Sequence, residues 1–303
     1  MPAAQPRASR TPAPATAGEM LEMARGFLLR KDLEDARLEA ELLVAHALDM
    51  DRLGLFMALD RSVSGDEVDR ARDLLVRRGR REPTAYIIGR REFYGRNFAV
   101  CPDVLIPRPE TELLVDRVRE LVAAADPSAK PTRIAELGTG SGCVAVTLAL
   151  ELPDACVTAT DNSADALARA GANAEALGAR VCFLEGDGLA PLLEVVGREG
   201  LFDLLVSNPP YVGTDERDAL APEVVEHEPQ QALFAPEGDR DHWVRLLVTQ
   251  GLELIAPGGH LLVELGAEQG SAAASLCEER GDDWVLVPDL AGVDRVLQVS
   301  RPS

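Results

Sequence analysis

The stretch Arg133-Ile-Ala-Glu-Leu-Gly-Thr-Gly-Ser-Gly-Cys-Val-Ala-Val146 decides the fold. It combines a short apolar strand, a turn with glycine at alternate positions and the start of a helix. Glycine lets the backbone approach a ligand without a Cβ in the way, and a helix start offers free N–H groups. The spacing G-x-G-x-G differs from the G-x-G-x-x-G of dinucleotide folds, and no lysine follows to make a P-loop. The turn predicts a nucleotide-like cofactor, with a purely structural tight turn as the alternative.

Beyond Pro131, short apolar strands alternate with helical stretches, which is typical of a doubly wound α/β sheet. We expect strands at 133–137, 156–160, 180–185, 202–207, 259–265, 284–288 and 293–299. The helices between them are expected to begin near Gly142, Ser163, Leu189, Arg240 and Gln269. Only Asp289 to Gly292 separates the last two strands, which is too short for a crossover helix, so these strands must be antiparallel neighbours.

The rest of the chain divides into segments of different composition. Residues 1–17 are rich in alanine and proline, which predicts a disordered tail, with an organellar transit peptide as the alternative. Leucine and alanine recur at helical spacing over 18–86, which predicts a small helical domain whose last helix opens with the capping box Ser64-x-x-Glu67. Residues 87–106 alternate apolar residues with turn formers and predict a β-hairpin linker. The α/β domain then occupies 107–303.

Two acidic residues follow the second and third expected strands. Asp161 lies about 20 residues past the glycines, where an acid can accept hydrogen bonds from both hydroxyls of a ribose. Capping the helix that follows is a second role, compatible with the first. Asp187 precedes Gly188, and a carboxylate there could hold the amino group of adenine, although an Asp-Gly pair is ordinarily a turn.

The segment Ser207-Asn-Pro-Pro-Tyr211 follows the fourth strand and carries the sharpest chemical signal. Two prolines stop the sheet and stiffen the backbone at its carboxyl end, where α/β folds bind ligands. The Asn208 oxygen and the Pro209 carbonyl can accept the two N–H bonds of a planar amide or exocyclic amine, which localises the nitrogen lone pair for attack. Tyr211 can wall in the planar group. A surface turn is the alternative interpretation.

The composition limits the class of partner. A net charge of −20 opposes binding to nucleic acid, and no apolar run is long enough to cross a bilayer or to act as a secretory signal, so we expect a cytoplasmic protein. An arginine-rich stretch over 70–81 is an exception within this acidic chain: it indicates a solvated helix face or a docking site. Five scattered cysteines without a C-x-x-C pair predict neither a disulfide framework nor a metal site.

Together these motifs resemble the HemK/PrmC family of N5-glutamine methyltransferases over residues 20 to 300. The resemblance also rests on Gly89-Arg-Arg-Glu-Phe-Tyr-Gly95, Ile106-Pro-Arg-Pro-Glu-Thr-Glu112 and Glu228-Pro. It implies a helical N-terminal domain, a hairpin linker and a seven-stranded, Rossmann-like methyltransferase domain that uses S-adenosyl-L-methionine. The implied substrate is the glutamine of the Gly-Gly-Gln motif in class 1 peptide-chain release factors. We also expect a monomer, and from charge and composition no direct contact with nucleic acid or membrane.

The resemblance also implies roles for single residues. The cofactor is expected to contact Gly138, Thr139, Gly140, Ser141, Gly142, Asp161, Asp187, Gly188 and Asn208. The substrate is expected to contact Asn208, Pro209, Pro210, Tyr211, Arg108 and Glu110, with Asn208, Pro209 and Tyr211 catalytic. Glu136 stands where the family usually has aspartate, and Gly188 where relatives often have a bulkier residue.

Three other functions share parts of this evidence. A close cousin of the family methylates a glutamine of a ribosomal protein. Adenine-N6 methyltransferases of nucleic acid use the same four-residue motif, but they need base flipping and a basic groove, which this acidic chain does not predict. A nucleotide-binding regulatory module without catalysis would not need Asn208 beside the cofactor motif.

Overall fold

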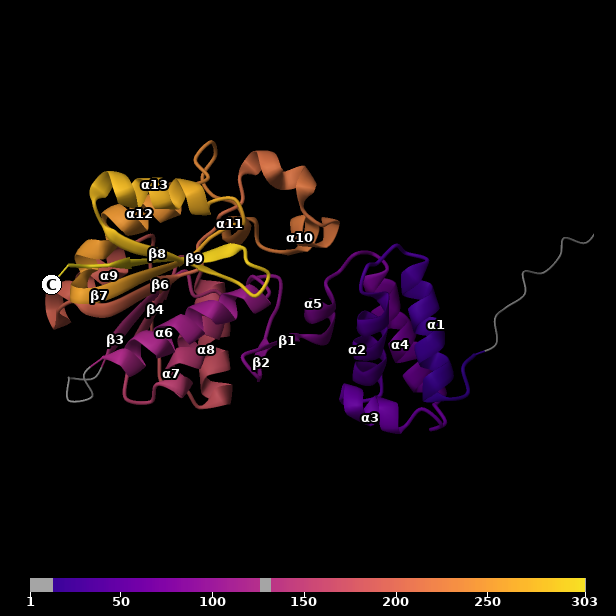
Figure 1. Ribbon diagram of the computed structural model, residues 1–303. Coiled ribbons are helices and arrows are strands. Elements are labelled where there is room, and N and C mark those ends of the chain that lie inside the picture. The colour runs from indigo at the N-terminus through magenta and orange to yellow at the C-terminus, as the bar shows by residue number, and fades with distance from the viewer. Residues whose placement is uncertain (1–12, 126–131, 303) are drawn as a thin grey trace, which may run out of the picture. The chain divides into compact units, whose positions relative to one another are not determined.

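The computed structural model describes residues 13–125 and 132–302, and the chain divides into two compact units between Ile88 and Gly89 (Figure 1). The first unit is helical, as predicted. Its helices are α1 (Ala17–Leu29), α2 (Ala36–Ala47), α3 (Arg52–Met57), α4 (Gly65–Arg78) and α5 (Thr84–Ile88).

The start of this unit differs slightly from the expected boundary. Residues 1–12 of the predicted tail lie outside the described residues, but Thr16 and Ala17 belong to the helical unit. The Thr16 hydroxyl accepts a hydrogen bond from Glu19 N at 3.2 Å and so caps α1, and Ala17 is fully buried. A capping hydroxyl satisfies one of the N–H groups that a helix start leaves without a partner, which favours the start of α1 at this position.

The capping box at the start of α4 is present as predicted, because Ser64 Oγ accepts from Glu67 N and the Glu67 carboxylate accepts from Ser64 N. Most of the arginine-rich stretch pairs with acids of the same unit. Arg78 is buried and donates to Glu39 at 2.8 Å, and Arg70 lies 3.4 Å from Asp49. These pairs favour a structural role for the stretch.

The second unit contains a hairpin and the α/β domain. Its strands are β1 (Arg90–Phe93), β2 (Arg96–Ala99), β3 (Arg133–Leu137), β4 (Cys156–Asp161), β5 (Cys182–Glu185), β6 (Phe202–Ser207), β7 (Ile255–Glu264), β8 (Asp283–Pro288) and β9 (Asp294–Ser300). Its α-helices are α6 (Glu112–Ala124), α7 (Cys143–Glu151), α8 (Ala164–Leu177), α9 (Ala190–Glu199), α10 (Pro222–His227), α11 (Gln230–Leu233), α12 (His242–Thr249) and α13 (Gly270–Arg280). Short 3-10 helices are η1 (Pro109–Thr111), η2 (Thr214–Ala219) and η3 (Gly251–Leu254).

The hairpin of β1 and β2 packs onto the α/β domain. Phe93 and Phe98 are buried, with ring centroids 6.0 Å apart in an edge-to-face arrangement. Asn173 of α8 accepts from Ala99 N at 2.8 Å and donates to Ala99 O at 3.0 Å. The segment expected to link two domains is therefore also part of the core of the second one.

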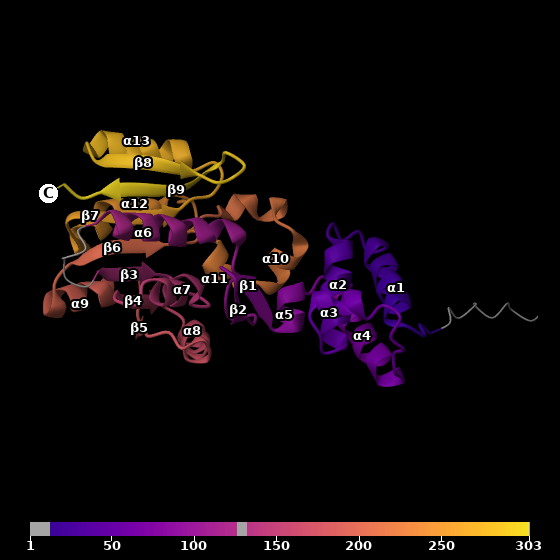
Figure 2. The same ribbon diagram turned by 60° about the horizontal axis from the view of Figure 1, so that its bottom comes forward.

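The seven-stranded sheet has the order β5-β4-β3-β6-β7-β9-β8, which can be followed from one edge to the other in Figure 2. All neighbours are parallel except those of β9, which pairs antiparallel with both β7 and β8. This confirms the predicted antiparallel pair at the end of the chain. β7 starts at Ile255, four residues before the expected strand, with an irregular register against β6 between Phe202 and Leu204.

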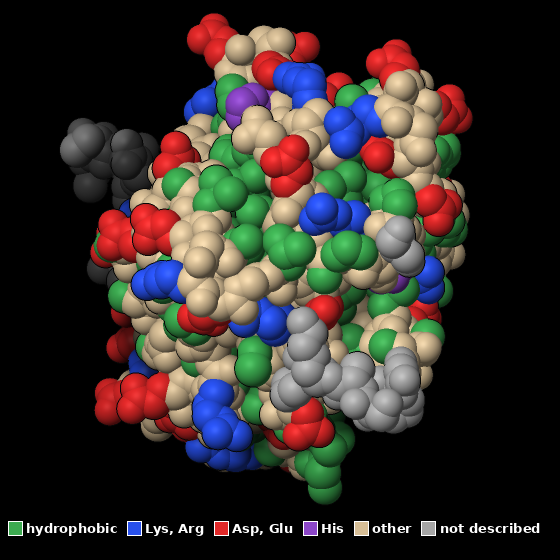
Figure 3. Space-filling view, turned by 90° about the vertical axis from the view of Figure 1, so that its left-hand side faces the viewer, with side chains coloured by type: hydrophobic (Ala, Val, Ile, Leu, Met, Phe, Trp, Pro, Cys, Tyr) green, Lys and Arg blue, Asp and Glu red, His purple; other side chains and the backbone are tan. Residues whose placement is uncertain are grey.

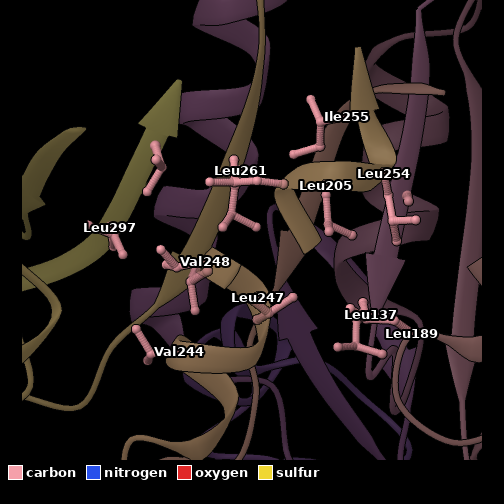
Figure 4. Packing of buried hydrophobic residues seen from close by; sticks show 14 of the residues in the cluster. Leu137, Leu189, Leu205, Val244, Leu247, Val248, Leu254, Ile255, Leu261 and Leu297 are labelled. Atoms are coloured by element: carbon pink, nitrogen blue, oxygen red, sulfur yellow. The ribbon is translucent and has the colours of Figure 1, made fainter. Parts of the chain in front are cut away.

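Helices cover both faces of the sheet and enclose two cores. One core joins the strands to α9, α12 and α13, and in Figure 4 Leu205 of β6, Leu261 of β7 and Leu247 of α12 are among its side chains. The other joins the strands to α6, α7, α8 and the hairpin. β4 lies on one side of β3 in the sheet, and β6, which follows later in the chain, lies on the other side of β3. The strand order therefore reverses between β3 and β6, and the carboxyl ends of these two strands form the switch point where such sheets bind ligands.

Candidate functional site

The glycine turn between β3 and α7 is shaped by backbone conformation. Gly138, Gly140 and Gly142 have φ values of 76°, 54° and 80°, a region that side chains with a Cβ rarely adopt. A Cβ on Gly142 would lie 3.0 Å from the Cβ of Ala170 in α8, whereas Gly138 and Gly140 have open space at that position. Gly142 is therefore required for packing, and the other two leave room for a ligand.

Glu136 lies beneath this turn, buried at the end of β3. Its Oε2 accepts from the Thr139 hydroxyl at 2.6 Å and from Ala145 N of α7 at 3.2 Å. Burial raises the pKa of Glu136 to about 8, against the effect of these two hydrogen bonds. Glu136 and Thr139 thus hold the turn to the start of the helix and do not line the cavity described below.

Asp161 is the last residue of β4, and its side chain contacts the glycine turn that follows β3. Its Oδ2 accepts from Gly140 N at 2.8 Å and its Oδ1 from Ser163 N at 3.0 Å, while Ser163 Oγ caps α8 by accepting from Ala166 N. A carboxylate has about four acceptor positions, so two stay open for the hydroxyls of a ligand. Both predicted roles of Asp161 are therefore compatible with its geometry.

Asp187 follows β5 and is exposed at the cavity, with no side-chain hydrogen bond to any described residue. The backbone before it passes close to α9, because a Cβ on Gly186 would lie 2.4 Å from Pro191 Cγ. This close approach positions the Asp187 carboxylate and Gly188 at the rim of the same cavity.

Asn208 follows β6, beside the glycine turn. Its Nδ2 donates to the Thr111 hydroxyl oxygen at 3.0 Å, and Ser207 Oγ donates to Leu137 O at 2.9 Å. With the amide nitrogen engaged, the Asn208 oxygen has no partner among the described residues. Tyr211 is half-buried against Gly266, and burial, together with nearby Glu264, raises its pKa to about 12. Its hydroxyl is therefore neutral at physiological pH.

Glu228 ties the loop after β6 to the segment before η1. Its side chain is only 1% exposed and accepts from Ile106 N at 3.1 Å and from Arg108 at 2.7 Å. Arg108, expected to contact substrate, is therefore held by an internal ion pair. Glu110 is exposed, and no hydrogen bond joins it to a described residue.

A cavity of about 120 Å³, partly open to solvent, lies at this switch point. It brings together the predicted residues Gly138, Gly140, Asp161, Asp187, Gly188, Asn208, Pro209 and Pro210. The remaining predicted residues lie behind or beside it: Thr139, Ser141, Gly142, Tyr211, Arg108 and Glu110. The sequence reasoning missed Leu105, Gln231 and Trp243, which also line it and carry no motif.

The electrostatic character of the lining is acidic. Asp103, Asp161 and Asp187 contribute carboxylates, and no lysine or arginine is among the lining residues. Such a lining favours a ligand that carries positive charge and hydroxyl donors. Within the described parts of the chain, no group of three or more His, Cys, Asp or Glu side chains is arranged to hold a metal ion, and no helix is long and apolar enough to span a membrane.

Comparison with known proteins assigns both units. Residues 19–89 match the family model of the PrmC N-terminal domain, and residues 111–239 match that of the methyltransferase small domain. The catalytic domain of hMettl16 in complex with a MAT2A 3'UTR hairpin has a TM-score of 0.54 with this structure, at 17% identity over 78% of this chain and 81% of that one. This likeness shows the fold alone.

Relatives in sequence match nearly the whole chain. Release factor glutamine methyltransferase from Geobacter sulfurreducens is 41% identical over 93% of this chain and 95% of its own length. The protein of the same name from Koribacter versatilis is 40% identical over 95% of this chain and 99% of its own. This degree and extent of identity show that the chain belongs to the release factor glutamine methyltransferase family.

Proposed function

We propose that the protein transfers a methyl group from S-adenosyl-L-methionine to the side-chain amide nitrogen of the glutamine in the Gly-Gly-Gln motif of class 1 release factors. Its family membership supports the reaction and the substrate. The observation that supports the site is Asn208, whose amide nitrogen is held by Thr111 so that its oxygen is left to accept from a substrate amide.

The cavity suits the cofactor in the open space over the glycine turn and in the charge of its lining. The open space over Gly138 and Gly140 suits the methionine part, and the acidic lining suits a positively charged sulfonium. Asp161 would accept from the ribose hydroxyls with its two open positions, and Asp187 from the adenine amino group. Thr139, Ser141 and Gly142 would act indirectly, by keeping the turn in place.

The substrate nitrogen is weakly nucleophilic, because its lone pair is delocalised into the amide. When bound, the cofactor supplies an electrophilic methyl group. The Asn208 oxygen and the Pro209 carbonyl would accept the two N–H bonds of the glutamine amide, which orients its lone pair and fixes the nitrogen in place. Pro209 and Pro210 make these acceptors rigid, since each fixes its own φ. Tyr211, neutral and packed on Gly266, would limit the space beside the amide.

Nucleic acid and a ribosomal protein are the two alternative substrates; charge argues against the first, and an assay tests the second. A nucleic-acid substrate would face a chain of net charge −20 and a cavity lined by acids, and on the face shown in Figure 3 basic side chains are interspersed with acidic ones. We therefore propose a protein substrate and no direct nucleic-acid contact. We also propose a monomeric enzyme that acts in the cytoplasm. The ribosomal-protein substrate is tested directly.

The test is methyl transfer with labelled S-adenosyl-L-methionine, offered a class 1 release factor, a ribosomal extract and adenine-containing oligonucleotides in parallel. We expect label on the Gly-Gly-Gln glutamine of the release factor, located by peptide mass spectrometry, and its loss when that glutamine is changed to alanine. Labelling of a ribosomal protein or of an oligonucleotide instead would reject the proposal, and binding of the cofactor without any transfer would indicate a regulatory module.

A further inference from the structure

Glu264 is a buried carboxyl group that the proposed chemistry does not use. It is the last residue of β7, is 2% exposed, and its Oε2 has no hydrogen-bond partner in the described structure. A buried carboxylate oxygen without a hydrogen-bond partner is costly, so its presence next to a reactive site calls for an explanation.

The sheet places Glu264 beside Asn208. β6 and β7 are parallel neighbours, with Ser207 opposite Val263 in the register, so the next residue of each strand emerges at the same point of the carboxyl edge. Thr111, which is buried at the end of η1, interacts with both of these residues. Its hydroxyl oxygen accepts from Asn208 Nδ2 at 3.0 Å, and its side chain lies near enough to the Glu264 carboxyl group to act as a donor that lowers the pKa of Glu264.

The chemistry of these three groups fixes the direction of the hydrogen bonds. An ionised carboxylate only accepts, so the single hydrogen of the Thr111 hydroxyl points to Glu264. The Thr111 oxygen is then left as an acceptor on its other side, and only the nitrogen end of the Asn208 amide can satisfy it. The oxygen end of Asn208 must therefore face away from Thr111.

We propose that Glu264 is a positioning residue, which acts through Thr111 to orient the Asn208 amide so that its oxygen faces the substrate. This inference rests on the proposed function, in which Asn208 accepts from the reacting amide. The two ends of an amide have nearly the same size, so packing alone does not select between them, whereas hydrogen-bond direction does. A flipped Asn208 would present N–H groups to the N–H groups of the substrate glutamine.

The charged groups around Glu264 explain why this control depends on pH. Burial raises its pKa to about 7; Glu110 adds to the rise, whereas Thr111, Arg295 and Arg108 oppose it. Each of these arginines is already paired with another acid, Arg295 with Asp289 at 3.0 Å and Arg108 with Glu228 at 2.7 Å. Tyr211 and Cys143 also lie within electrostatic range, and both are neutral at physiological pH because their pKa values are raised to about 12.

Protonation of Glu264 removes the constraint. A neutral carboxyl group can donate to Thr111, whose own hydrogen is then free to point at Asn208, and the flipped amide becomes acceptable. Turnover of the wild-type enzyme should therefore rise with pH through the pKa of Glu264 and then level off.

The experiment compares full-length variants with a class 1 release factor as substrate. Glu264→Gln keeps the size of the side chain but introduces a donor, and we expect kcat to fall about tenfold, the effect of losing one hydrogen bond of ordinary strength. KM and the cofactor Kd should stay within about twofold, because no ligand contact is removed. The variant should also lose the rise of kcat with pH. Glu279→Gln, at an exposed position of α13, is the matched control.

Variants of Thr111 keep the inference testable if Glu264→Gln fails to fold. Thr111→Val, of nearly the same shape, should lower kcat like Glu264→Gln, and Thr111→Ser should restore most of it, because serine keeps the hydroxyl. In the Asn208→Ala background, Glu264→Gln should cause no additional loss, since both changes act on one chain of hydrogen bonds.

Three results would overturn the inference: a wild-type kcat in Glu264→Gln, a loss that adds fully to that of Asn208→Ala, or a loss confined to cofactor affinity or stability. Failure of the proposed function is recognised separately, because the wild-type enzyme would then not methylate the release factor at all.

Discussion

Asp161 Oδ2 accepts a hydrogen bond from Gly140 N at 2.8 Å, so the acid that ends β4 holds the turn that follows β3. Two neighbouring strands of the sheet are thereby joined at their carboxyl ends by one carboxylate. A residue that appears in the sequence as a ligand contact is also a support for the glycine turn, and its variants must be interpreted with both effects in view.

Asp161→Ala should weaken S-adenosyl-L-methionine binding by at least tenfold, since each charge-assisted hydrogen bond contributes about 1.5 to 3 kcal/mol. Asp161→Asn should bind better than Asp161→Ala, because its amide oxygen can still accept from Gly140 N. Calorimetric titration measures both, with Asp165→Ala, at an exposed position of α8, as the control. Unchanged affinity in Asp161→Ala would exclude a ribose contact.

Asn208→Ala should leave cofactor affinity largely intact and lower turnover by roughly 100-fold or more, because it removes an acceptor that orients the reacting nitrogen. Single-turnover methylation of a release factor and calorimetric binding of the cofactor separate the two effects. Asn97→Ala, at an exposed position of β2, is the matched control. If cofactor affinity falls while turnover survives, Asn208 binds the cofactor and does not orient the substrate.

Glu136 should make stability depend on pH. Its pKa is raised from 4.5 to about 8 by burial, so the folded state favours the protonated form. The stabilisation is complete below the pKa of the unfolded chain and is lost as pH rises through about 8, with a slope of up to about 1.4 kcal/mol per pH unit. The free energy of unfolding in urea should fall between pH 5 and 9 for the wild type.

The variant Glu136→Gln isolates this effect. Its amide oxygen can still accept from Thr139 and Ala145, and it does not titrate, so its stability should fall less over the same pH range. Glu264 also titrates in this range, so the comparison uses the difference between the two proteins. Parallel pH curves would show that Glu136 is ionised in the folded enzyme throughout.

The helical unit should serve substrate choice. The lining of the cavity comes entirely from the second unit, and a glutamine on a flexible loop offers little binding energy of its own. We expect a truncated protein that starts at Gly89, where the second unit begins, to bind S-adenosyl-L-methionine like the full chain. It should methylate an intact release factor much less efficiently, mainly through a higher KM.

A short Gly-Gly-Gln peptide is the control substrate for this truncation. It should be poor for both proteins, with a far smaller difference between them, and circular dichroism checks that the truncated form is folded. Equal losses of kcat/KM on factor and peptide would mean that the helical unit supports the catalytic one, and no loss on either would remove it from recognition.

The sequence by itself determined the secondary structure and the order of the motifs. Strand and helix periods, glycine spacing and prolines act within a few residues, so the glycine turn, the capping box at Ser64 and the antiparallel pair β8 and β9 could all be predicted. Asp161 and Asn208 were both expected to contact the cofactor, and they line one cavity because parallel strands end at one edge of the sheet.

Only the tertiary structure decided which side chains face the ligand and which hold the site together. Thr139 and Ser141 lie in the motif but point into the protein, and Arg108 is taken up by Glu228, which is 120 residues away in the chain. Thr111, at the end of η1, accepts a hydrogen bond from Asn208 and lowers the pKa of Glu264 at the end of β7. Such contacts depend on burial and on distances between segments far apart in sequence, and no local period encodes them.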